Sequence, residues 1–150
     1  MSEQKIKKLI IGIGNEGRGD DGLGWRFAEK AEVLSAENFD IEYRYQLQVE
    51  DAELVSRYDY VIFADATVEW FENGFDFAPC KSGGEYFFSS HLQSPEAVLH
   101  LAETLYKARP EAYIMRICGK EWEMGIGLSI QASESLKKAI AYFEKYVINF

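Results

Sequence analysis

Two long apolar runs stand out along the chain and predict two buried strands. The first covers residues 6–13 and is followed by glycine, and the second covers residues 58–66 and reads YDYVIFADA. Runs that stay apolar at successive positions are typical of parallel strands covered on both faces. The three weaker strand patterns cover residues 41–47, 85–89 and 112–118. Polar and apolar residues alternate in the first of these, which predicts a strand near an edge of the sheet.

Apolar residues at helical spacing predict helices between these strands. Leu23, Phe27 and Ala31 fall on one helical face, and charged residues fall on the other. Ser94 is a suitable N-cap before a proline at the first helical position, and Pro110 is expected to end that helix. The predicted helices cover residues 21–34, 50–57, 94–109 and 129–147.

This alternation of strands and helices predicts an α/β fold. We expect a three-layer sandwich, with a mainly parallel, five-stranded twisted sheet and helices on both of its faces. The chain has 150 residues, 47% of them hydrophobic, and no repeat or flexible linker divides it. These features predict a single domain over residues 1–150. In open sheets of this kind, ligands bind beyond the carboxyl ends of the strands.

Composition narrows the classes of partner. The formal net charge of −9 argues against nucleic acid, which binds to clustered Lys and Arg side chains. The apolar runs are too short for a membrane span, and the N-terminal stretch does not resemble a signal peptide. Cys80 and Cys118 form no C-x-x-C motif and are expected to be free thiols in a reducing compartment. We therefore expect a cytoplasmic protein that binds neither nucleic acid nor membrane.

Three chain segments bring acidic or imidazole side chains to the predicted carboxyl edge of the sheet. Asp20 and Asp21 follow the first strand, Asp65 ends the central strand, and His91 precedes the helix that begins near Ser94. Two carboxylates and one imidazole suit a borderline divalent cation. Three protein ligands also leave coordination positions open for another molecule.

Each candidate also has a structural interpretation. Asp20 is a good N-cap for the following helix, and we expect capping to be its main role. Asp21 could serve the same purpose, and His91 alone could be a structural histidine. Asp65 is harder to explain in this way, because a carboxylate inside an apolar run is costly to bury unless it is paired or bound to a cation.

The glycines of the first segment raise an alternative function. Gly12, Gly14 and Gly17 match G-x-G-x-x-G, the pattern of a dinucleotide-binding turn. Asp20 and Asp21 would repel a diphosphate at that position, so a tight strand-to-helix turn is the better interpretation. A nucleotide or small-ligand binding module remains the alternative, and protection by a dinucleotide against thermal unfolding would favour it.

The ordered set of motifs resembles that of the hydrogenase maturation proteases, endopeptidases that trim the C-terminal tail of nickel–iron hydrogenase large subunits. The matching positions are Gly12, Gly14, Asn15, Asp20, Asp21 and Gly24 in the first motif, Asp65 in the second, His91 in the third and 127–129 in the last. The resemblance implies that Asp21, Asp65 and His91 form a site that is both metal-binding and catalytic, supported by the turn of the first motif. It also implies that no cofactor is bound permanently. By the same resemblance, we expect the hydrogenase large-subunit precursor to supply the nickel, and we expect that other divalent cations such as cadmium can occupy the site. We expect a monomer.

One segment departs from the family pattern. Where the family often has a D-G-G-T-like turn, this chain has QLQVE over residues 46–50. Because that turn is linked to substrate recognition in the family, a relative that binds a partner without cutting it is a further alternative. The aromatic stretch over 68–88 could cover the sheet or dock a partner. The residues expected to dock the substrate are Gln46, Gln48, Glu50, Trp70 and Trp122.

Overall fold

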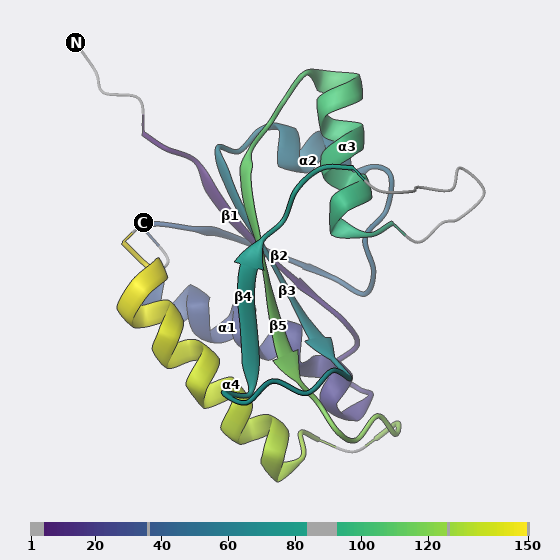
Figure 1. Ribbon diagram of the computed structural model, residues 1–150, viewed down its shortest axis with the longest axis vertical. Coiled ribbons are helices and arrows are strands. Elements are labelled where there is room, and N and C mark those ends of the chain that lie inside the picture. Colours follow the sequence, from purple (N-terminus) through teal and green to yellow (C-terminus); the bar gives the residue numbers. More distant parts are fainter. Residues whose placement is uncertain (1–4, 36, 84–92, 126, 150) are drawn as a thin grey trace.

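The computed structural model describes residues 5–35, 37–83, 93–125 and 127–149 (Figure 1). Its strands are β1 (Lys8–Ile13), β2 (Asp40–Arg44), β3 (Tyr60–Thr67), β4 (Phe75–Pro79) and β5 (Glu111–Cys118). Its α-helices are α1 (Leu23–Ser35), α2 (Asp51–Ser56), α3 (Pro95–Tyr106) and α4 (Ile130–Tyr142). A 3-10 turn, η1 (Gly19–Gly22), precedes α1, and a π-helical turn, η2 (Phe143–Val147), continues α4.

The five strands form one sheet in the order β2-β1-β3-β5-β4. The first four are parallel to one another, and β4 runs antiparallel to β5 at the edge. The two long apolar runs form β1 and β3 inside the sheet, where both strand faces are covered. The predicted α/β fold with a mainly parallel five-stranded sheet is therefore confirmed.

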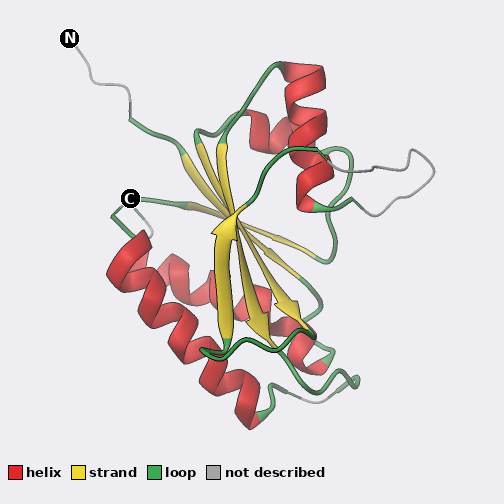
Figure 2. Cartoon of the chain, in the orientation of Figure 1, coloured by secondary structure: helices red, strands yellow, loops and turns green. Residues whose placement is uncertain are grey.

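Helices cover both faces of the sheet (Figure 2). On one face, α1 and α4 cover a hydrophobic core that includes Ile10 and Ile62 of the strands and Phe27 of α1. On the other face, α2 and α3 cover a second hydrophobic core. It includes Ile11 and Phe63, the strand residues that directly follow Ile10 and Ile62. Successive strand residues point to opposite faces, so each central strand contributes to both cores. No helix in the described ranges is long and apolar enough to span a lipid bilayer.

The edge strand β4 lies where the sequence predicted only an aromatic segment. Phe75 and Phe77 flank Asp76, and this alternation places both rings against Tyr142 of α4. Asp76 forms an ion pair with Arg116 of β5, with 2.9 Å between the carboxylate and guanidinium atoms. These two rings therefore cover the sheet. The predicted strand over residues 85–89 lies outside the described residues.

Two helix ends can be compared with their predictions. The Ser94 hydroxyl accepts a hydrogen bond from the Ala97 N–H, which confirms Ser94 as the N-cap of α3. The prediction that Pro110 ends this helix is wrong. The helix ends at Tyr106 because Lys107 adopts a left-handed conformation with φ of 56°.

Candidate functional site

The acidic turn between β1 and α1 is shaped by close backbone contacts. Gly14 has φ of 133°, and a Cβ at this position would collide with the carbonyl oxygen of Asp21. A Cβ at Gly12 would lie 2.7 Å from the carbonyl oxygen of Gly24 and 2.8 Å from the Ala28 Cβ. These glycines let α1 pack closely on β1, as the tight-turn interpretation predicted. Close backbone contacts therefore account for Gly12 and Gly14 without a bound phosphate.

Asp65 lies at the end of β3, beside the turn that carries Asp21. Its Oδ1 accepts a hydrogen bond of 2.8 Å from the Ala66 N–H. Burial raises the pKa of this carboxyl to about 7, against the opposing effect of the Ala66 bond, and the negative charge of Asp21 adds to the rise. A carboxyl with this pKa is partly protonated at neutral pH. Perturbation of this kind is common among groups at functional sites.

Asp21 is oriented by the turn that precedes it. Its Oδ2 accepts a hydrogen bond of 3.0 Å from the Asn15 N–H, and the Asn15 side chain accepts another from the Gly17 N–H at 2.9 Å. Asn15 therefore supports the turn in two ways. In the described part of the chain, neither Asp21 nor Asp65 forms an ion pair.

The two carboxylates separate two hollows in the protein surface. The smaller, of about 220 Å³, is lined by Ile13, Gly14, Asp21, Tyr45, Gln46, Leu47, Asp65, Gln93 and Pro95. The larger, of about 460 Å³, is lined by Arg18, Asp21, Asp65, Ala66, Thr67, Val68 and Trp122. An extended chain crossing the carboxylates would have one hollow on each side of them.

Only some of the predicted docking residues line the hollows beside these carboxylates. Trp122 lines the larger hollow and Gln46 lines the smaller one. Gln48, Glu50 and Trp70 line neither, although Trp70 is 81% exposed. The structure therefore brings only two of the five predicted docking residues to the carboxylate pair.

The third predicted ligand, His91, lies outside the described residues. The structure thus brings Asp21 and Asp65 together and does not test the position of the histidine. Among the residues that the structure describes, no three His, Cys, Asp or Glu side chains form a group that could hold a metal ion. Both cysteines are free, as predicted, and both are buried.

Asp20 has a different role from the predicted one. The N-cap position of η1 is Arg18, without a side-chain cap, and the Asp20 side chain is fully buried. It accepts hydrogen bonds from the backbone N–H groups of Lys120, Glu121 and Ser129 and from the Ser129 hydroxyl. Burial by itself would raise the pKa of Asp20, but these hydrogen bonds hold it below its ordinary value. The expectation of helix capping is wrong because the partners that Asp20 contacts are about a hundred residues away in the sequence.

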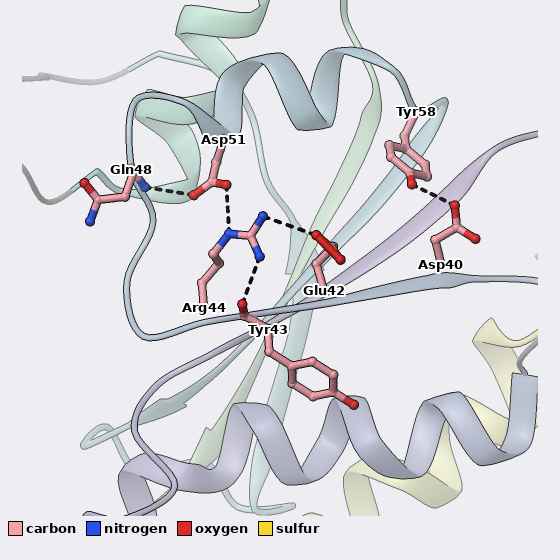
Figure 3. A network of polar contacts seen from close by, with 7 residues as sticks. All are labelled: Asp40, Glu42, Tyr43, Arg44, Gln48, Asp51 and Tyr58. Carbon is pink, nitrogen blue, oxygen red and sulfur yellow. Dashed lines mark hydrogen bonds and ion pairs between the residues drawn. The ribbon is translucent and has the colours of Figure 1, made fainter.

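An ion pair that the sequence did not predict anchors the segment over residues 46–50 (Figure 3). Arg44, at the end of β2, donates to Asp51 through Nε at 3.0 Å and lies 3.3 Å from Glu42. Asp51 also accepts a hydrogen bond of 2.9 Å from the Gln48 N–H. An acidic residue at the start of a helix is the one sequence signal that could have drawn attention to Asp51.

The middle of this segment is held as well. The side chain of Leu47 is buried, and its carbonyl oxygen accepts a hydrogen bond of 3.2 Å from the Gln93 N–H, just before α3. The segment is therefore held at its centre, at Leu47 and Gln48, and by Asp51 just beyond its C-terminal end. Gln46 directly precedes these held residues and lines the smaller hollow together with Asp21.

Replacing the buried acid of this network is expected to destabilise the fold. Asp51→Ala should lower the free energy of unfolding by about 2 kcal/mol, because it leaves the Gln48 N–H and the Arg44 guanidinium without their shared acceptor. Urea denaturation measures this. Glu53→Ala, in the same helix, removes only an exposed ion pair with Arg57 and should change the stability by less than about 0.5 kcal/mol. Equal losses in the two variants would contradict the structural role of Asp51.

The raised pKa of Asp65 predicts a pH-dependent gain in stability on its replacement. Because the carboxyl prefers its proton in the folded state, the wild-type protein loses stability as the pH rises from about 4 to about 7. A rise from 3.8 to about 7 corresponds to at most about 4 kcal/mol. Asp65→Asn keeps an acceptor for the Ala66 N–H and carries no charge. It should therefore be more stable than wild type by about 1–3 kcal/mol at pH 8, and nearly equal at pH 4.

Thermal unfolding of both proteins across this pH range tests that expectation. A stability difference that does not change between pH 4 and pH 8 would contradict the assigned pKa. A variant that is less stable at pH 8 would show that the Asp65 charge is compensated in the folded protein.

Comparisons with known proteins show which solved structures share this fold. No protein-family model matches the chain, and no curated protein matches it. Among solved structures, it is similar to the hydrogenase maturating endopeptidase HybD from E. coli, with a TM-score of 0.72, 19% identity, and coverage of 91% of this chain and 88% of that one. It is also similar to the NiFe hydrogenase maturation protease HycI from Thermococcus kodakarensis, with a TM-score of 0.69, 21% identity, and coverage of 97% and 92%.

A third similar structure is the NiFe hydrogenase maturation protease HybD from Thermococcus kodakarensis. Its TM-score is 0.62 at 22% identity, and the match covers 93% of this chain and 98% of that one. At these identities the likeness establishes the fold. These structures therefore also support the α/β fold that the alternation of strands and helices predicted.

Proposed function

We propose that this protein is a hydrogenase maturation protease. In this proposal it is an endopeptidase that removes the C-terminal tail of a hydrogenase large-subunit precursor and recognises the nickel that the precursor already carries. The observation that carries the proposal is the pair Asp21 and Asp65. These carboxylates meet at the carboxyl end of the sheet, between two hollows, and form no ion pair among the described residues. The fold of the similar maturation proteases and the ordered motifs support the same conclusion.

A divalent cation would supply the positive charge that these two carboxylates lack. The Asp65 carboxyl holds its proton up to about pH 7 because it is buried beside another acid. A metal ion arriving with the substrate would neutralise both charges and displace that proton. Carboxylates are suitable ligands for such an ion, and the proposal takes His91 as the third ligand.

Two catalytic roles for this arrangement are compatible with the proposal. The nickel can polarise the scissile carbonyl, or it can position the peptide while a carboxylate acts as general acid or base. In both cases the substrate tail would lie across the carboxylates and enter both hollows. Trp122 and Gln46, which line those hollows, are the residues that we expect to contact the tail.

The test is the intact mass of a nickel-loaded large-subunit precursor after incubation with the protein. We expect the loss of a C-terminal peptide, and no loss from precursor that lacks nickel. Asp65→Asn serves as the inactive control. If the loaded precursor keeps its mass but forms a stable complex with the protein, the non-cleaving relative becomes the better description. If the precursor neither binds nor changes, the proposed function is wrong.

A further inference from the structure

The segment after β5 is docked along the acidic turn. The Asp20 N–H donates to the Glu121 carbonyl oxygen at 2.7 Å, and the Gly125 N–H donates to that of Gly17 at 2.9 Å. The Arg18 side chain donates from Nε to the Trp122 carbonyl oxygen at 3.3 Å. Two loops that are about a hundred residues apart in the sequence therefore form one structural unit.

The Asp20 carboxylate is the centre of this unit. Its Oδ2 accepts from the N–H groups of Lys120 and Glu121 at 2.7 and 2.8 Å, and from the Ser129 hydroxyl at 2.7 Å. Its Oδ1 accepts from the Ser129 N–H at 2.8 Å. Hydrogen bonds to an ionised acceptor are about twice as strong as neutral ones. One buried side chain thus fixes the backbone immediately before Trp122 and the start of α4.

The Trp122 side chain packs over Gly119, close to Asp20. A Cβ at Gly119 would lie 2.6 Å from the Trp122 ring and 2.9 Å from the Asp20 Cβ. The ring therefore lies over Gly119, next to Asp20, in a space that no larger residue at position 119 would leave open. From this place the indole lines the hollow that contains Asp65.

We propose that Asp20 is a positioning residue for substrate binding. By fixing the backbone of Lys120 and Glu121, it holds the Trp122 indole as a wall of the hollow beside Asp65, where the substrate tail binds. This inference rests on the proposed function, since it assigns Trp122 to the contact with the tail. Asp20 is not a catalytic residue, because its side chain is fully buried, lines neither hollow and uses both oxygens for structural hydrogen bonds.

Asp20→Asn tests the proposal with little change in shape. The amide keeps one oxygen but directs an NH2 group at one or more of the backbone N–H donors. The segment after β5 therefore loses some of its hydrogen bonds to residue 20. We expect the KM for the nickel-loaded precursor to rise about 10-fold, with kcat changed less than about 3-fold. Trp122→Ala should raise KM by a similar factor, because truncating a buried aromatic contact typically has an effect of this size.

The double variant decides whether Asp20 acts through Trp122. If it does, Asp20→Asn combined with Trp122→Ala should raise KM no further than Trp122→Ala alone. Multiplied effects would overturn the proposal. Phe143→Leu, a core change at the opposite end of the helix that begins after Ser129, provides a control for lost stability. This control should leave KM unchanged.

A fluorescence measurement tests whether Asp20 positions the Trp122 side chain, and it needs no cleavage assay. In a background of Trp25→Phe and Trp70→Phe, Trp122 is the only tryptophan, and acrylamide quenching reports its exposure. Asp20→Asn should increase the quenching constant, and unchanged quenching would overturn the proposal. If the wild-type protein fails to cut loaded precursor, the proposed function fails, and the quenching result still decides whether Asp20 positions Trp122.

Discussion

Asp65→Asn is expected to abolish cleavage of the nickel-loaded precursor, with a fall in rate of at least about 100-fold. The amide has nearly the shape of the carboxyl and can accept the Ala66 hydrogen bond, but it can neither carry a charge nor exchange a proton. Whether Asp65 binds the metal or transfers a proton, both roles need the carboxylate. The measurement is the rate at which the C-terminal peptide is released, followed by mass spectrometry.

Asp76→Asn is the matched control for this change. Asp76 is also a partly buried strand aspartate, but it pairs with Arg116 at the edge of the sheet and lines neither hollow. Its variant should cleave within about 2-fold of wild type, since it lies outside the site. If thermal unfolding shows that Asp65→Asn is at least as stable as wild type at pH 8, its inactivity cannot come from unfolding. Cleavage by folded Asp65→Asn at a rate close to wild type would remove Asp65 from the site.

The parts of the fold that the sequence predicted share a physical cause. β1 and β3 are buried on both faces, so their sequences are apolar at successive positions and stand out from the rest of the chain. Parallel neighbours end at the same edge of a sheet, so Asp21 and Asp65 could be placed together before any contact was known. Local pattern and general topology were sufficient for both predictions.

The features that escaped prediction depend on contacts between distant segments. Asp20 has the sequence context of a helix cap, yet its buried carboxylate binds backbone groups near residue 120. The alternation around Asp76 is only five residues long, and its strand could not be distinguished from a covering aromatic loop. The Arg44–Asp51 pair joins the end of a strand to a helix across a turn whose shape the sequence does not specify.

Gly24→Ala is expected to have the largest effect on stability. Gly24 lies in the first turn of α1, where the helix meets β1 and β3, and a Cβ there would collide with the carbonyl oxygens of Ile13 and Ala64. These are backbone atoms of two central strands, so no side-chain rotation can relieve the contact. The helix would have to move away from the sheet and separate the core around Phe27. We expect a loss of more than about 4 kcal/mol, which is exceptional for a single substitution.

Gly127→Ala makes the same chemical change at a position where nothing lies within 4 Å of the new Cβ. It should change the free energy of unfolding by less than about 0.5 kcal/mol. Urea denaturation of both variants separates the steric effect from any general effect of the added methyl group. Because the displaced helix begins just after Asp21, Gly24→Ala should also weaken metal binding in any protein that remains folded. A folded Gly24→Ala variant with wild-type stability would contradict the close helix–sheet contact that places Asp21 beside Asp65.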